Sequence, residues 1–159
     1  LQTALLFEAA SHTGALLAQE NTQSINNQQV EDMQLFGLHF GMAYQLLDDW
    51  LDYTGDSESM GKNVGDDLAE GKLTLPLIYA LQHTDSHSQS VIKNALQTKH
   101  VAALPQILDI IRGCGGLDYT RACAQNEIEA AIQCLNKLPT NDYQQALISL
   151  SHFSLSRLG

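Results

Sequence analysis

Apolar residues recur every three or four positions along almost the whole chain, and this spacing limits the fold more than any other feature. Runs that alternate apolar and polar residues, as half-buried strands do, are absent, and so are Asn-Gly hairpin turns. The sequence therefore predicts an all-α protein. Its 159 residues, 44% of them apolar, can bury the core of a single domain spanning 1–159.

The interruptions of this pattern predict where helices begin and end. The expected helices cover residues 3–19, 28–54, 75–84, 86–98, 101–113, 117–138 and 141–157. Thr74 is a candidate N-cap with Pro76 in the first turn, and the glycines of "GCGG" at 113–116 separate two helices. Residues 55–72 are expected to be irregular, and loops of that length in compact domains are usually functional or disordered.

The charge balance excludes several classes of partner. With 18 acidic residues against 8 basic ones, the chain would repel nucleic acids and anionic lipid head groups. No apolar stretch reaches the roughly 18 residues of a membrane span, and "LQTALLFEAA" lacks the basic start of a signal peptide. We therefore expect a cytoplasmic protein with no transmembrane segment, in which Cys114, Cys123 and Cys134 are buried, reduced thiols.

Three aspartates interrupt the apolar segment at 35–53. On a helical wheel, Asp48, Asp49 and Asp52 share an arc of about 100 degrees with Gln45 and Gly41, while large apolar residues occupy most of the rest. This pattern is typical of a buried central helix with one polar stripe. Because burying an unpaired carboxylate costs several kcal/mol, the stripe predicts a cation there. The alternative is a frayed acidic helix end exposed to solvent near Gly55.

A hard divalent cation suits these carboxylates. Asp48 and Asp52 lie one turn apart and can bind a metal such as Mg²⁺ through oxygen, with Asp49 adding charge. Since Mg²⁺ usually shares its ligands with waters and substrate phosphates, the metal also predicts a phosphate-bearing ligand. Lys62 and Lys72, each after a glycine in the following stretch, could bind that phosphate, or could simply be solvated surface residues.

Other motifs in this region fail on spacing. Asp66 and Asp67 could hold the two lysines or outer waters in place. "GDSESMGKN" and "GDDLAEGKL" have one residue too many between the glycines for a P-loop, and no Glu closes a twelve-residue EF-hand loop. The six histidines are scattered, without the spacing of a metal pair, and are expected to be structural or surface residues.

The segment "GMAYQLLDDWLDYTGD...MGKNVGDDLAEGKLTLPLIYAL" closely resembles the second aspartate-rich region of trans-type polyprenyl diphosphate synthases. The shared pattern is Gly, three residues, Gln, two residues, Asp-Asp-x-x-Asp, then a loop ending in Gly-Lys-x-Thr-x-Pro. Weaker similarity extends over nearly the whole chain. Within the family, the chain is most similar to bacterial octaprenyl diphosphate synthases, which make quinone side chains.

The resemblance implies an isoprenoid-synthase-type helical bundle, of which this chain is the C-terminal part, and a prenyltransferase activity. An allylic prenyl diphosphate would be elongated with isopentenyl diphosphate, with Mg²⁺ bound to the diphosphate. Asp48 would be the principal metal ligand, supported by Asp49 and Asp52. Substrate contacts would come from Thr3, Gln45, Lys62 and Lys72, and Asp48 and Lys62 would act directly in catalysis.

Two features depart from the family pattern. Gln2 stands where the family has a lysine, and residues 1–159 contain no first Asp-Asp-x-x-Asp motif. We therefore expect the isolated chain to be inactive and the full-length protein to be a homodimer, as family members usually are. A non-catalytic partner or regulatory subunit and a purely structural acidic domain remain as alternatives.

Overall fold

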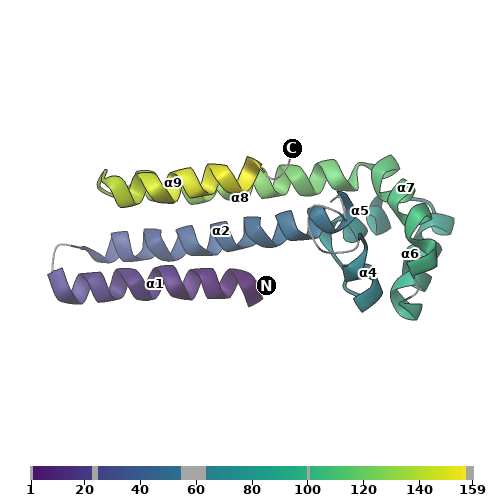
Figure 1. Ribbon diagram of the computed structural model, residues 1–159, viewed down its shortest axis with the longest axis horizontal. Helices are drawn as coiled ribbons and strands as arrows, with labels where there is room; N and C mark the ends of the chain where they lie inside the picture. Colours follow the sequence, from purple (N-terminus) through teal and green to yellow (C-terminus); the bar gives the residue numbers. More distant parts are fainter. Residues whose placement is uncertain (1, 23–24, 55–63, 100, 157–159) are drawn as a thin grey trace. The chain divides into compact units, whose positions relative to one another are not determined.

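The computed structural model describes residues 2–22, 25–54, 64–99 and 101–156. The described residues form helices and turns with no strand among them, which confirms the all-α prediction (Figure 1). The α-helices are α1 (Gln2–Thr22), α2 (Asn27–Thr54), α4 (Asp66–Glu70), α5 (Leu75–His83), α6 (Ser86–Thr98), α7 (Leu104–Cys114), α8 (Gly116–Asn136) and α9 (Asp142–Leu155). None of them is long and apolar enough to cross a membrane.

The helix boundaries follow the sequence pattern with two differences. The helix expected at 101–113 is divided into a 3₁₀ turn, η1 (Val101–Ala103), and α7. Helix α4 lies inside the stretch predicted to be irregular, of which 55–63 falls outside the described residues. It escaped prediction because five residues are too few to show a helical period; the left-handed Gly65 and Gly71, with φ of 86° and 76°, bound it instead.

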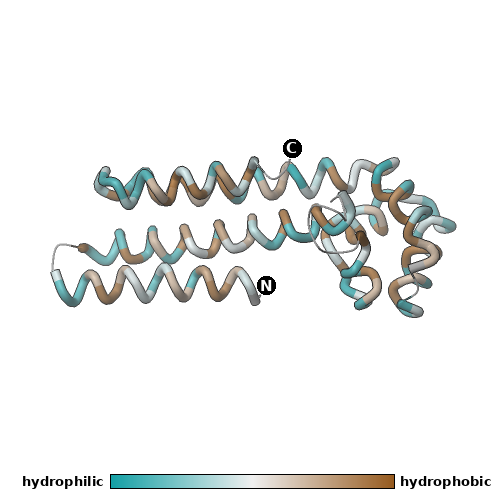
Figure 2. The backbone as a smooth tube through the Cα atoms, in the orientation of Figure 1, coloured by the Kyte–Doolittle hydropathy of each residue, from teal (hydrophilic) through white to brown (hydrophobic). Residues whose placement is uncertain are grey.

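The chain divides into two compact units. Unit 1 comprises residues 1–45 and 123–159, and unit 2 comprises residues 46–122. Helices α2 and α8 each contribute to both units. Figure 2 shows apolar residues recurring at helical intervals along α1 and α2, as the sequence pattern predicts.

Unit 1 is held together by close packing between α1 and α2. A Cβ atom on Gly37 would lie 2.5 Å from the backbone oxygen of Phe7, and one on Gly41 would lie 2.6 Å from the Cα of Ala4. These two positions on α2 therefore require glycine if the helices are to approach this closely. The core of the unit is formed by α2 and α8 residues: Phe36, Phe40, Ala43, Ile128, Ala131, Cys134 and Leu135.

Unit 1 also contains a buried ion pair. Asp32 on α2 is 2% exposed, and its carboxylate accepts a hydrogen bond from the Lys137 ammonium at 3.0 Å. The Gln28 amide donates a longer bond of 3.4 Å to the same oxygen. The buried charge is thus matched by one cation.

Unit 2 has a core of its own, which surrounds the last turns of α2. Its buried residues are Tyr53, Leu68, Leu77, Ala80, Ile92, Ala95, Ile107 and Ile111. They come from α2, α4, α5, α6 and α7, so α4 is packed into this core through Leu68.

The cysteine prediction is half right. Cys114, Cys123 and Cys134 are all unpaired thiols, as expected, but only Cys134 is buried. Cys114 ends α7 and its thiol donates to the backbone oxygen of Ile111, so it lies at a helix end rather than on the buried face. Cys123 on α8 is likewise partly exposed.

Candidate functional site

The three aspartates of the acidic stripe lie on the last two turns of α2, within unit 2. Leu47 and Leu51 are buried there, and Asp49 is only 7% exposed, while Asp48 and Asp52 are half-buried. A frayed, solvated helix end would leave Asp49 exposed. The described residues thus favour a buried polar stripe over the frayed alternative.

Helix α4 is fixed to the end of this stripe by backbone groups. The Gly65 amide donates to the backbone oxygen of Asp52 at 2.9 Å, and the Asp67 amide donates to the Asp52 carboxylate at 3.3 Å. The buried Leu68 side chain anchors the short helix in the core of unit 2. Asp52 is therefore in contact with both Gly65 and Asp67.

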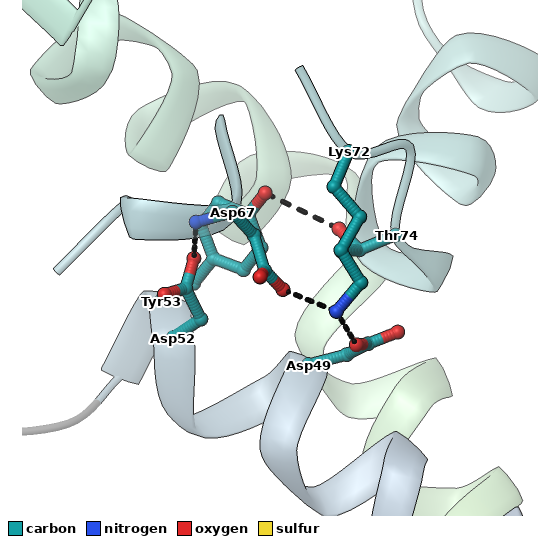
Figure 3. A network of polar contacts seen from close by, with 6 residues as sticks. All are labelled: Asp49, Asp52, Tyr53, Asp67, Lys72 and Thr74. Carbon is teal, nitrogen blue, oxygen red and sulfur yellow. Dashed lines mark hydrogen bonds and ion pairs between the residues drawn. The ribbon is translucent and has the colours of Figure 1, made fainter. Parts of the chain in front are cut away.

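Lys72, which follows α4, contacts one aspartate of α2 and one of α4. Because Gly71 adopts a left-handed conformation, the Lys72 amide can donate to the Asp67 backbone oxygen at 2.8 Å. The Lys72 ammonium donates to the carboxylates of Asp67 at 2.9 Å and Asp49 at 3.0 Å (Figure 3). The prediction that an aspartate of this segment holds a lysine is confirmed for Asp67 and Lys72.

A second polar contact, which sequence reasoning missed, lies beside this one. The Thr74 hydroxyl donates to the Tyr53 hydroxyl at 3.2 Å, and both side chains are almost completely buried. Thr74 does precede α5 as an N-cap residue, but its side chain makes no cap hydrogen bond. The signal was a tyrosine at an apolar helix position, since a buried phenol usually requires a polar partner.

The electrostatics of the site reflect an excess of carboxylates. Burial, followed by the nearby charges of Asp67 and Asp66, raises the pKa of Asp52 to about 6. Burial works against the charged form of Lys72, yet hydrogen bonds to Asp67 and Asp49 raise its pKa above the ordinary value. Burial also raises the pKa of Tyr53. One ammonium therefore faces several neighbouring carboxylates.

The donor set suits a hard divalent cation. All the charged acceptors are carboxylate oxygens, which Mg²⁺ and Ca²⁺ prefer. Among the described residues, no group of three or more His, Cys, Asp or Glu side chains could hold a metal ion by itself. A cation there would have to complete its shell with waters or ligand oxygens, as Mg²⁺ commonly does.

The remaining predicted site residues lie elsewhere. Thr3 and Gln45 belong to unit 1 and are both partly buried. Thr3 precedes Ala4, the residue that packs against Gly41. Lys62 lies outside the described residues.

Comparison with known proteins identifies relatives of this chain. The sequence profile of the family described as Polyprenyl synthetase matches residues 1–111. An all-trans-nonaprenyl-diphosphate synthase (geranyl-diphosphate specific) from Rhodobacter capsulatus is 41% identical over 157 residues, covering 99% of this chain and 46% of the relative. The octaprenyl diphosphate synthase of Escherichia coli K12 is 39% identical, covering 98% and 47%.

The structural comparison agrees with the sequence comparison. A polyprenyl synthase from Caulobacter crescentus CB15, whose crystal structure is a complex with calcium and isoprenyl diphosphate, superposes with a TM-score of 0.85 at 36% identity. The match covers 99% of this chain and 47% of that protein. The chain thus spans about half the length of its relatives, adopts the all-α isoprenoid synthase fold, and belongs to the polyprenyl synthetase family.

Proposed function

We propose that residues 1–159 are the C-terminal part of a single polyprenyl synthase domain that makes a long-chain, octaprenyl diphosphate for quinone side chains. The complete protein would be a cytoplasmic homodimer. It would join an allylic prenyl diphosphate to isopentenyl diphosphate in an Mg²⁺-dependent reaction. The observation that carries this proposal is the gathering of Asp49, Asp52 and Asp67 beside the Lys72 ammonium, in a chain that belongs to the polyprenyl synthetase family.

The reaction begins with cleavage of the allylic carbon–oxygen bond, whose electron pair leaves with the diphosphate. The double bond of isopentenyl diphosphate then attacks the allylic carbocation to form a carbon–carbon bond, and loss of a proton restores a double bond. The products are pyrophosphate and a prenyl diphosphate five carbons longer. A divalent cation, when bound, would neutralise charge on the departing diphosphate.

Different residues of this chain would bind the cation, contact the diphosphate and exclude water. Asp48, Asp49 and Asp52 would hold the cation, with Asp48 as the principal ligand. Thr3, Gln45 and Lys62 would contact the allylic diphosphate through hydroxyl, amide and ammonium groups. The apolar helices would exclude water from the carbocation, which water would otherwise trap.

Product analysis of the complete polypeptide tests this function. Incubation with farnesyl diphosphate, labelled isopentenyl diphosphate and Mg²⁺ should give a labelled prenyl diphosphate, and chelation of the cation should abolish it. The chain length of the product decides between octaprenyl and other lengths. Failure to elongate the allylic substrate at any Mg²⁺ concentration would contradict the proposal.

The isolated 159-residue chain provides a second test. We expect it to be inactive, because the family's first aspartate-rich motif is absent from its sequence. The alternative is a non-catalytic partner or regulatory subunit. It predicts instead that this chain, added to a complete synthase, changes that enzyme's rate or product length.

A further inference from the structure

The Lys72 ammonium is already bound to two carboxylates, which is not expected of a lysine that binds a substrate diphosphate. The ammonium lies 3.0 Å from one oxygen of Asp49 and 2.9 Å from one oxygen of Asp67 (Figure 3). Counted for the side chains alone, Asp49 and Asp67 are 9% and 16% exposed, whereas Lys72 is 38% exposed. To reach a diphosphate, the ammonium would have to abandon two partly buried anions, and that is costly.

The contact also joins two segments of unit 2 that are far apart in sequence. Asp49 lies on α2, while Asp67 and Lys72 lie on and just after α4. The hydrogen bonds from the Gly65 and Asp67 amides to Asp52 hold the beginning of α4 against α2. The bond from Lys72 to Asp49 holds the chain just after α4 against the same helix. The lysine thus fixes the Asp49 carboxylate from the side of α4.

We infer that Lys72 is a positioning residue of the cation site, which orients Asp49 and Asp67 and neutralises part of their charge, rather than a ligand of the diphosphate. The inference rests on the proposed function. It implies that the aspartates differ in whether Lys72 contacts them. Asp49 and Asp67 share the lysine, whereas the Asp52 carboxylate accepts a hydrogen bond from the Asp67 backbone amide.

Substitution of Lys72 in the complete polypeptide tests the inference without substrate. Lys72→Met keeps the length of the side chain and removes its charge, whereas Lys72→Arg keeps the charge. Without substrate or cation, Lys72→Met should lower the unfolding midpoint by about 5 °C. In an Asp67→Asn background the same substitution should cost less, because the two residues share one interaction.

Cation binding and kinetics separate positioning from a purely structural tie. With one positive charge removed, Lys72→Met should bind Mg²⁺ about fivefold more tightly in calorimetry. Asp48→Ala, which lacks the proposed principal ligand, shows how much Mg²⁺ binds elsewhere on the protein. Turnover should fall about tenfold, because the carboxylates are no longer oriented, and the KM for the allylic diphosphate should change less than about threefold. Lys72→Arg should restore most of both properties.

Lys137→Met is the matched control, because it removes a lysine from another buried aspartate, Asp32 in unit 1. It should lower the unfolding midpoint but leave Mg²⁺ affinity and turnover unchanged. If Lys72→Met behaves like this control, Lys72 is only a structural tie and the inference is wrong. An unchanged midpoint with an allylic KM raised at least about tenfold would make Lys72 a substrate ligand, which also overturns it.

Failure of the proposed function would look different. In that case the unsubstituted polypeptide itself would bind no Mg²⁺ at this site and elongate no allylic diphosphate. The positioning role would then be overturned as well, although the coupling between Lys72 and Asp67 in unfolding would still be measurable.

Discussion

The two units each bury an aspartate that meets a lysine, but they differ in how much charge is left over. In unit 1, Asp32 is 2% exposed and one ammonium, from the 57% exposed Lys137, matches its charge. In unit 2, the single ammonium of Lys72 is shared by Asp49 and Asp67, and Asp52 lies alongside. A buried ion pair with equal charges is accounted for by folding alone, whereas an excess of carboxylates indicates a ligand.

The pKa directions express the same difference. Lys137 in unit 1 has a raised pKa because of its hydrogen bond to Asp32 and the charge of that residue. In unit 2, the pKa of Lys72 is raised as well. The pKa of Asp52 is also raised there, because burial and the neighbouring carboxylates disfavour its charged form. Unit 2 therefore holds negative charge at a cost in stability, which a bound cation would remove.

The largest expected effect comes from removing the principal ligand in unit 2. In the complete polypeptide, Asp48→Ala should lower turnover by about 10²- to 10³-fold, because charge on the departing diphosphate is no longer neutralised by a correctly held cation. Steady-state assays with saturating Mg²⁺ measure this. The unfolding midpoint without ligands should fall little or even rise, since one negative charge has left the stripe. A near-normal turnover would remove Asp48 from its assigned role.

The next effect concerns the matched pair in unit 1. Lys137→Met should lower the unfolding midpoint by about 8 °C, because the buried Asp32 carboxylate keeps only the 3.4 Å bond from Gln28. Asp32→Asn should cost less, since the exposed Lys137 ammonium can turn to water. In the double variant the loss should be smaller than in Lys137→Met. Equal losses for both single variants would show that the asymmetry in burial does not govern this pair.

How much of this comparison the sequence could predict depends on the range of the interaction. The helices and the acidic stripe follow from local periodicity, and the α6 bounds match the prediction at both ends. The sequence also predicted that Asp66 or Asp67 could hold Lys72, and Asp67 and Lys72 are only five positions apart. The pairing of Asp32 with Lys137 was not predicted, because 105 positions separate the two residues and neither belongs to a recognisable sequence motif.

Long-range packing likewise hid the role of two glycines. Gly41 was predicted as part of the polar stripe, and the structure adds that α1 approaches it closely at Ala4. Gly37 had no predicted role, although it lies one turn earlier on the same face. A helical wheel gives the face of one helix but not the distance to its neighbour, so these contacts required the folded chain.

Glycine substitutions test whether packing, rather than charge, governs unit 1. Gly41→Ala should reduce the free energy of unfolding by about 1 to 3 kcal/mol, because its Cβ would lie 2.6 Å from the Ala4 Cα and backbone cannot move aside as a side chain can. Gly14→Ala on α1 is the control. No atom lies within 4 Å of its Cβ, so it should be neutral or stabilise the helix by up to about 1 kcal/mol. Denaturant titration measures both, and equal effects would contradict the close approach of α1 and α2.

The smallest effect concerns the N-terminal end of α9 in unit 1. The Asn141 side chain accepts a hydrogen bond from the Gln144 amide at 2.8 Å and so caps α9. Asn141→Ala removes this acceptor and should lower the free energy of unfolding by about 1 kcal/mol, whereas Asn141→Ser keeps an acceptor and should lose much less. Since both variants replace one neutral side chain with another, added salt should change the difference between them little. A strong salt dependence would mean that a neighbouring charge, such as that of Asp142, changes the contribution of the cap.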